Sequence, residues 1–167
     1  MIRPAVAADA SWIADIWNGI IADTLVTFTT VPKTPDAVAE MIAEQTVLVA
    51  DTQAGFATFG PFRSGPGYAA TVEHTVLLSR AARGQGIGTA LMQGLITEAQ
   101  AAGHRVMVAA ISGENPPAVA FHAALGFQMV AHMPQVGRKS GRWLDLILMQ
   151  KVLTGVHDGD ALPADRV

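Results

Sequence analysis

The clearest chemical pattern lies in one short stretch, Arg83-Gly84-Gln85-Gly86-Ile87-Gly88, which follows an apolar segment ending at Leu78. A glycine-rich turn that ends a strand and opens a helix leaves several backbone N–H groups unpaired at the positive end of the helix dipole. Glycines let a ligand approach the main chain closely, and the guanidinium of Arg83 adds a fixed positive charge. The combination predicts a phosphate-binding turn.

Three known phosphate-binding patterns compete to describe this turn. The dinucleotide pattern G-x-G-x-x-G, begun at Gly84, would need glycine at position 89, where the chain has Thr89. The nucleotide P-loop would need Gly-Lys-Ser/Thr, which the turn lacks. The remaining pattern is R-x-x-G-x-G, formed by Arg83, Gly86 and Gly88. A glycine-rich turn without a ligand is the alternative interpretation, because the chain contains 16 glycines.

Three further elements are needed to position this turn. The apolar segment from Val72 to Leu78 is typical of a buried strand, and the apolar residues of 91–99 recur with the helical period before Gly103. A further apolar run, Arg105 to Ile111, predicts a second strand. Strand, turn, helix and strand make a βαβ unit, for which we expect a right-handed connection.

The rest of the chain predicts short elements around this unit. Strands are predicted at 2–5, 46–50, 56–62, 127–131 and 143–151, and helices at 10–20, 35–44 and 118–125. Asp9 and Thr34 are the predicted N-caps of the first two helices, and Asn115 that of the last. Residues 22–32 have β-type composition but could equally be a loop over a binding site. Residues 134–142 are polar and basic, and we expect them to link the last two strands.

Composition bounds the class of protein. The 167 residues are half apolar, which suits one domain, predicted at 1–153, with a poorly ordered tail at 154–167. The formal net charge of −3 and the lack of a Lys/Arg run argue against a general nucleic-acid binder. Without cysteine, the chain has no disulfide, thiolate metal site or cysteine nucleophile.

Neither a metal site nor a membrane segment is expected. The histidines outside the helix at 118–125 show no metal-ligand spacing among themselves; they are His74, His104, His132 and His157. The N-terminal residues lack an apolar segment of signal-peptide length, and no later run approaches a membrane span. We therefore expect a soluble cytoplasmic protein.

Two separated motifs resemble the signatures of one superfamily. The R-x-x-G-x-G turn resembles the pyrophosphate-binding signature of the GNAT superfamily of N-acetyltransferases. The stretch from Asn115 to Phe127 resembles its second signature, in which an asparagine opens a helix that closes at Leu-Gly-Phe. Segments 71–75, 106–109, 133–137 and 141–146 are similar to the phosphinothricin and methionine sulfoximine/sulfone acetyltransferases. Ala118 departs from the family, which usually has serine there, and His122 stands where much of the superfamily has tyrosine.

The resemblance implies a mixed α/β fold with a central, splayed β-sheet of about six to seven strands flanked by about four helices. The numbers of strands and helices predicted above agree with this fold. It also implies acetyl-coenzyme A as cosubstrate, and a homodimer in which segment 133–142 helps to complete the partner's site. The pyrophosphate would lie on residues 83–89, and the pantetheine amides would pair with the main chain of residues 76–78 like an added strand. The cofactor-binding residues implied in this way are Val76, Leu77, Leu78, Arg83, Gly84, Gln85, Gly86, Ile87, Gly88, Thr89, Asn115 and His122.

Amide formation from a thioester needs a neutral amine, a stabilised oxyanion and a protonated leaving thiolate. Glu73 is the candidate base that takes a proton from the substrate ammonium, directly or through water. Strand alternation puts Glu73 on one face with Thr71 and Thr75, facing either a groove or solvent, and a salt-bridge role is its alternative. A backbone N–H of residues 76–78 would hold the oxyanion. His122 lies where the family has its general acid, although a lone histidine in a helix can also be structural.

An amino-acid substrate also carries a carboxylate, for which arginine is a natural bidentate receptor. Arg63 fits by its position in the loop before the central strand, and Arg138, Lys139 and Arg142 are alternatives. Phe28 and Tyr68 could wall the side-chain pocket. The predicted substrate-binding residues are Phe28, Arg63, Tyr68, Thr71, Val72 and Glu73.

The leading hypothesis is an acetyl-coenzyme A-dependent N-acetyltransferase that acts on the α-amine of a small amino acid. Methionine sulfoximine, methionine sulfone and phosphinothricin are the substrates that the resemblance implies. A peptide or protein N-terminal acetyltransferase is the enzymatic alternative. A non-catalytic module that senses acyl-coenzyme A is the other.

Overall fold

The computed structural model describes residues 1–153, and the tail predicted at 154–167 lies outside the described residues. Within that range, seven strands form one mixed sheet in the order β1-β2-β3-β4-β5-β7-β6. Only β4 and β5 are parallel neighbours, and all other pairs are antiparallel. The strands are β1 (Ile2–Pro4), β2 (Val47–Ala50), β3 (Gly55–Pro61), β4 (Thr71–Leu78), β5 (Val106–Ser112), β6 (Gln128–Lys139) and β7 (Arg142–Val152).

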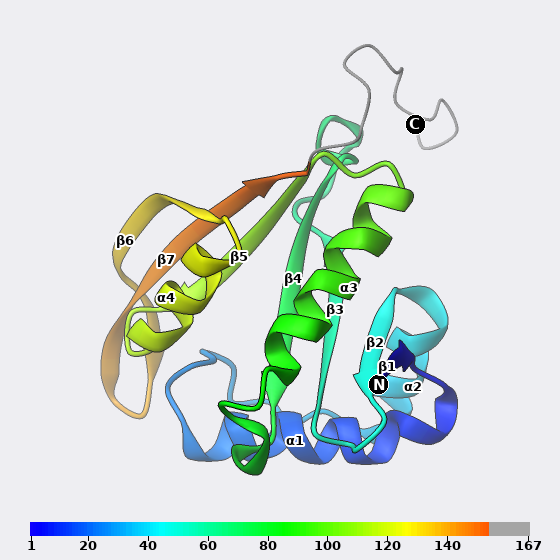
Figure 1. Cartoon of the computed structure of the whole chain (residues 1–167). Coiled ribbons are helices and arrows are strands. Elements are labelled where there is room, and N and C mark those ends of the chain that lie inside the picture. The colour runs from blue at the N-terminus through cyan, green and yellow to red at the C-terminus, as the bar shows by residue number, and fades with distance from the viewer. Residues whose placement is uncertain (154–167) are drawn as a thin grey trace.

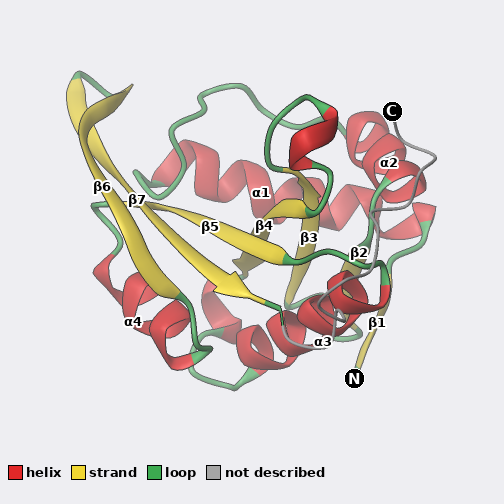
Figure 2. Cartoon of the chain, turned by 90° about the horizontal axis from the view of Figure 1, so that it is seen from above, coloured by secondary structure: helices red, strands yellow, loops and turns green. Residues whose placement is uncertain are grey.

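Four α-helices cover the two faces of this sheet in the described part of the chain. Helices α1 (Ala10–Asp23) and α2 (Pro35–Glu44) lie on one face, and α3 (Ile87–Ala101) and α4 (Pro116–Ala124) lie on the other (Figures 1 and 2). This arrangement confirms the predicted mixed α/β fold with about six to seven strands and about four helices.

Each face of the sheet has its own hydrophobic cluster, because neighbouring side chains of a strand point to opposite faces. Val47, Val49 and Phe56 pack under α1 and α2, whereas the intervening Leu48 and Ala57 pack under α3. The same alternation applies to β4, where it decides which side chains face α1 and α2.

The helix boundaries follow local sequence signals in most places. The Thr34 hydroxyl accepts a hydrogen bond from the Ala37 N–H at 3.1 Å and caps α2, as predicted. The prediction that Asp9 caps α1 is wrong, because its carboxylate makes no capping bond to that helix. It accepts hydrogen bonds from both terminal nitrogens of Arg3 instead, at 2.7 and 2.9 Å.

The predicted linker at 134–142 is also wrong. Strands β6 and β7 run through this segment and leave only Ser140 and Gly141 as the turn. Both turn residues have positive φ, 50° and 75°, which suits a two-residue hairpin. The segment resembles a linker in sequence because the hairpin extends beyond the other strands (Figure 1), so most of its side chains meet water.

Residues 24–34 connect α1 and α2 without regular secondary structure, so of the two interpretations the loop is right. No helix within residues 1–153 has the length and apolar character needed to cross a bilayer.

Candidate active site

The glycine-rich turn has the backbone geometry of an anion-binding helix start. Gly84 and Gly86 both have φ of 76°, a left-handed conformation that favours glycine. Gly86 is the N-cap of α3, and no side chain caps the helix there. The first-turn N–H groups of α3 therefore have no intrahelical acceptor and point out of the helix end. A Cβ atom added at Gly84 or Gly86 would meet nothing within 4 Å, so a ligand such as a diphosphate can approach this main chain.

Three residues in and beside this turn shape it. The Gln85 side chain donates a hydrogen bond to the Ala81 carbonyl at 2.7 Å and braces the loop. Gly88 lies where a Cβ atom would approach Leu78 and Phe121 at 3.3 and 3.5 Å, so its lack of a side chain permits close packing of α3. Arg83 lines a cavity between the turn and α1, where its guanidinium adds positive charge.

The parallel strands β4 and β5 separate close to this turn. Their pairing runs from Thr71 opposite Val106 to His74 opposite Ala109 and then stops. Beyond that point β4 continues against β3 as far as Leu78, and β5 continues against β7 as far as Ser112. Figure 1 shows the two strands diverging toward α1. One edge of residues 75–78 is therefore left without a neighbouring strand, as an added strand or a pantetheine arm requires.

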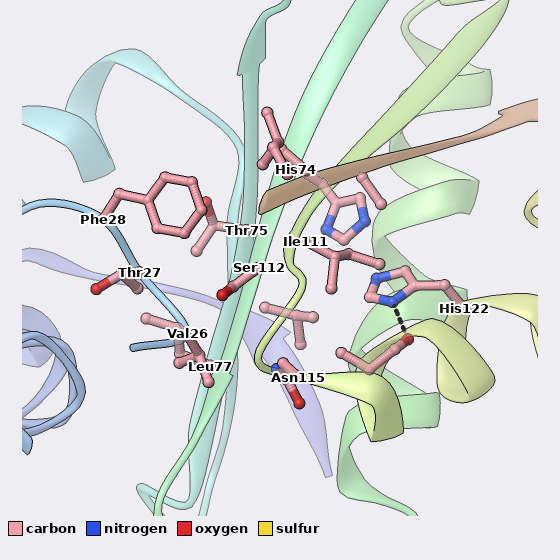
Figure 3. Close-up of a pocket in the computed structure, with 15 residues that line it drawn as sticks. Val26, Thr27, Phe28, His74, Thr75, Leu77, Ile111, Ser112, Asn115 and His122 are labelled. Carbon is pink, nitrogen blue, oxygen red and sulfur yellow. Dashed lines mark hydrogen bonds between the residues drawn. The ribbon is translucent and has the colours of Figure 1, made fainter. Parts of the chain in front are cut away.

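A cavity of about 300 Å³ occupies the gap between the separated strands. Figure 3 shows the α1–α2 loop on one side of it and His122 and Asn115 on the other, with Ser112 between them. The prediction that the Asn115 side chain caps α4 is wrong, because Asn115 is the N-cap residue but forms no capping hydrogen bond. Within residues 1–153 its amide is therefore available to a ligand. The residues that line this cavity are Val26, Thr27, Phe28, His74, Thr75, Val76, Leu77, Ala109, Ala110, Ile111, Ser112, Asn115, Ala118, His122 and Leu146.

Two stacked histidines form one wall of this cavity. The rings of His74 and His122 lie 5.0 Å apart and are 7% and 4% exposed. Burial lowers the pKa of His122, and burial together with His122 lowers the pKa of His74 to about 3. Both rings are therefore neutral near pH 7. Because Nδ1 of His122 lies 2.7 Å from the Ala118 carbonyl, it carries the ring proton, and Nε2 offers a proton acceptor.

Glu73 faces a second cavity of about 300 Å³, under α1 and α2. The predicted alternation of β4 therefore directs Glu73 toward a groove, where burial raises the pKa of its carboxyl. Thr75 lines both cavities, so they meet at this residue of β4. A carboxylate with a raised pKa beside the gap between β4 and β5 is suited to general base chemistry.

Lys33 lines the same second cavity. Its ammonium lies 5.0 Å from the centre of the Trp17 ring. The Asn18 side chain fixes the backbone of Lys33, accepting from its N–H at 2.7 Å and donating to its carbonyl at 2.9 Å. No local sequence signal indicates this arrangement, because Trp17 belongs to an apolar helix stripe and Lys33 to a loop.

The β6–β7 hairpin holds the α1–α2 loop that walls the first cavity. The Lys139 ammonium donates a hydrogen bond to the Thr27 carbonyl at 2.9 Å, and the Lys139 side chain is buried. Burial lowers the pKa of this ammonium. The ring of Phe28 covers Gly137 so closely that a Cβ atom there would overlap it. Both contacts join β6 to the α1–α2 loop of the same chain.

Several predicted substrate residues lie elsewhere. Arg63 stacks on Phe62 with 5.4 Å between guanidinium and ring, and Tyr68 packs on the same ring. Neither lines the two cavities that meet at Thr75. Val72 is 2% exposed in the core under α3.

The other predicted carboxylate receptors are occupied within the chain. Arg142 forms an ion pair with Glu114 at 2.9 Å, and Arg138 stacks on Trp143. Thr71 begins β4, two residues from Glu73 on the same face. Among residues 1–153, no three His, Cys, Asp or Glu side chains gather as a metal site would require.

Comparisons with known proteins agree with this geometry. Residues 20–127 match the sequence profile of the acetyltransferase (GNAT) family. The chain is 39% identical to the L-amino acid N-acyltransferase MnaT of Escherichia coli, with 96% of this chain and 98% of the relative covered. It is 40% identical to the L-methionine sulfoximine/L-methionine sulfone acetyltransferase of Pseudomonas aeruginosa, with 89% and 92% covered. It is 35% identical to the phosphinothricin N-acetyltransferase of Streptomyces viridochromogenes, with 90% and 86% covered.

Two solved structures share the whole fold. The Salmonella typhimurium protein yncA, solved with its cofactor acetyl-CoA, superposes with a TM-score of 0.90 at 37% identity, over 97% of this chain and 98% of the other. A ribosomal-protein-alanine N-acetyltransferase from Brucella melitensis superposes with a TM-score of 0.88 at 34% identity, over 92% and 99%.

Proposed function

Because the chain belongs to the acetyltransferase (GNAT) family and is an N-acetyltransferase, we propose that it acetylates the α-amine of a free, small amino acid. Acetyl-coenzyme A supplies the acetyl group as a thioester. The relatives named for methionine sulfoximine, methionine sulfone and phosphinothricin indicate the class of acceptor. The observation that carries the proposal is the separation of β4 from β5 after His74, which leaves the edge of residues 75–78 free and opens a cleft that shares Thr75 with the cavity of Glu73.

The residues present fit the cosubstrate. The unpaired N–H groups at the start of α3 and the guanidinium of Arg83 suit a diphosphate. The free edge of residues 76–78 suits the amides of the pantetheine arm, and one of its N–H groups would hold the thioester carbonyl. Asn115 lines the same cleft.

Glu73 acts as the base in this proposal. An α-amine is mainly an ammonium ion at neutral pH, and it attacks a carbonyl carbon only after losing a proton. Glu73 takes that proton, directly or through water, and Thr75 lies between it and the acyl cleft. The amine nitrogen then bonds to the acetyl carbon while the carbon–sulfur bond breaks.

The leaving thiolate needs a proton at the end of the reaction. We propose that His122, which lines the cleft, assists this step, in line with the superfamily's general acid. Because its Nδ1 proton is held by the Ala118 carbonyl, neutral His122 has no proton on Nε2 to give; Nε2 would accept the second proton, which the nitrogen releases as the amide forms, and pass it to the thiolate. Ser112 of β5 also lines the cleft and adds a hydroxyl group to its wall.

We also propose a cytoplasmic homodimer. The outer surface of the β6–β7 hairpin carries exposed apolar side chains that suit a partner; they are Val130, Met133, Val136 and Trp143, between 40% and 59% exposed. A cytoplasmic location suits a donor that is a highly charged intracellular metabolite. Light scattering at micromolar concentration should give twice the monomer mass, and a monomer alone would contradict the dimer.

The second candidate is a protein N-terminal acetyltransferase, which the Brucella melitensis relative favours by its name. The test is a panel of free L-amino acids and short peptides, assayed with acetyl-coenzyme A and a thiol reagent that detects free coenzyme A. Turnover of methionine sulfone supports the proposal. Turnover of peptides alone supports the second candidate, and turnover of neither would contradict both and favour an acyl-coenzyme A sensor.

A further inference from the structure

The second cavity carries opposite charges that do not neutralise each other. Glu73 lines it from β4, and Lys33 lines it from the loop before α2. Among residues 1–153, neither side chain forms an ion pair. Both are half-buried, so each charge has lost part of its hydration without gaining a charged partner.

The Lys33 ammonium is held in place by its neighbours. Asn18 binds both backbone polar groups of Lys33, and the ammonium lies over the Trp17 ring. A lysine on an indole face keeps its N–H donors free for another acceptor, because the ring attracts it through its π-face. These contacts hold the Lys33 ammonium at the wall of the cavity and restrict its motion.

We propose that the second cavity binds the zwitterion of a free α-amino acid, with the carboxylate on Lys33 and the amine toward Glu73. The inference rests on the proposed function and adds the residue that selects the substrate class. A volume of about 300 Å³ lies at the small end of ligand sites and suits one amino acid. Gln45 and Thr58 add polar side chains to the wall, and Thr75 lines both this cavity and the acyl cleft.

Binding of a carboxylate by Lys33 would favour a free amino acid over a peptide N-terminus as acceptor. A peptide N-terminus presents an amine but no α-carboxylate, so it would leave Lys33 without its anionic partner. Lys33 is a binding residue in this account, and Arg63, which stacks on Phe62 outside the cavity, is not.

The experiment compares L-methionine sulfone with its α-carboxamide as acceptors. The amide keeps the amine and side chain but removes the negative charge. We expect the wild-type kcat/KM to favour the acid by about 10- to 100-fold, the size of one charge-assisted hydrogen bond. Lys33→Met should reduce kcat/KM for the acid by a similar factor, mainly through KM, so that most of the preference for the acid over the amide is lost. Lys33→Arg should restore most of the preference.

The outcomes separate this proposal from the one on which it rests. Equal wild-type turnover of acid and amide would overturn the role of Lys33 while the acetyltransferase proposal stands. Turnover of no free amino acid would remove the proposed function itself. If Arg63→Met abolished the preference and Lys33→Met did not, the carboxylate would bind at Arg63 and the proposal would be wrong. A thermal unfolding midpoint of Lys33→Met close to that of the wild type shows that this variant is folded.

Discussion

Replacement of Gly137 by alanine tests how the hairpin shapes the wall of the acyl cleft. Gly137 does not adopt positive φ, so its backbone accepts any residue, and only sterics oppose the change. The new Cβ atom would overlap the ring of Phe28, which lines the cleft. The ring has to move, and the loop that carries it is tied to the same hairpin by the bond from Lys139 to the Thr27 carbonyl.

The magnitude follows from the kind of overlap. Overpacking of a well-packed site costs about 1–3 kcal/mol, and a chain of this length loses about 2–4 °C in Tm for each kcal/mol. We therefore expect Gly137→Ala to lower Tm by about 2–12 °C and to raise the KM for acetyl-coenzyme A, because Phe28 lines the acyl cleft. Gly19→Ala is the matched control, because nothing lies within 4 Å of the added methyl group and a helical glycine-to-alanine change stabilises by about 0.5–1 kcal/mol.

A double-mutant cycle decides whether Phe28 is the cause. In a Phe28→Ala background the obstructing ring is absent, so Gly137→Ala should cost nothing or stabilise slightly. Thermal unfolding of the four proteins gives the coupling free energy. An equal loss of stability in both backgrounds would refute the contact as the source of the effect.

Three further changes have predicted outcomes. Glu73→Gln should reduce kcat by about 10²- to 10⁴-fold near neutral pH and remove the acid limb of the pH–rate profile, where the raised pKa of Glu73 leaves its carboxyl protonated; an unchanged profile would exclude it as the base. His74 has a folded pKa of about 3, below the unfolded value of about 6.5, so the unfolded state binds a proton first as pH falls between them, and stability is lost. Urea unfolding should therefore show about 2 kcal/mol less stability at pH 5 than at pH 7.5 from this residue, a difference that His74→Leu removes; an equal pH dependence in that variant would disprove the assignment. Asp9→Asn should cost about 2–3 kcal/mol at pH 7, chiefly by weakening the bonds from Arg3; because those bonds lower the pKa of Asp9, its wild-type contribution should persist until strongly acidic pH, and loss of it at pH 5 would argue against the pairing.

The parts of the fold that depend on local sequence were predictable. The glycine turn, the period of α3 and the Thr34 cap each follow from residues within one or two turns of each other. Alternation along β4 correctly grouped Glu73 with Thr75. It could not say that this face meets α1 and α2, because that depends on how distant elements pack.

The parts that escaped prediction are contacts between distant segments. Lys139 and Thr27 are separated by 112 positions, and nothing in either neighbourhood indicates the other. The role of Lys33 could not be predicted for the same reason. It depends on contact with Trp17 of α1 and on Glu73, which lines the same cavity from β4. The hairpin was mistaken for a linker because polar side chains on a solvated ribbon have the composition of a loop.

The central claim is that β4 brings a coenzyme on its free edge and an amino acid beside Glu73 together at Thr75. A crystal structure with coenzyme A and L-methionine sulfone bound together tests it most directly. We expect the diphosphate to bind the backbone N–H groups of residues 84–89. The amine should lie within hydrogen-bond reach of Glu73, and the carboxylate should contact Lys33. A diphosphate bound elsewhere, or an amine directed away from Glu73, would contradict it.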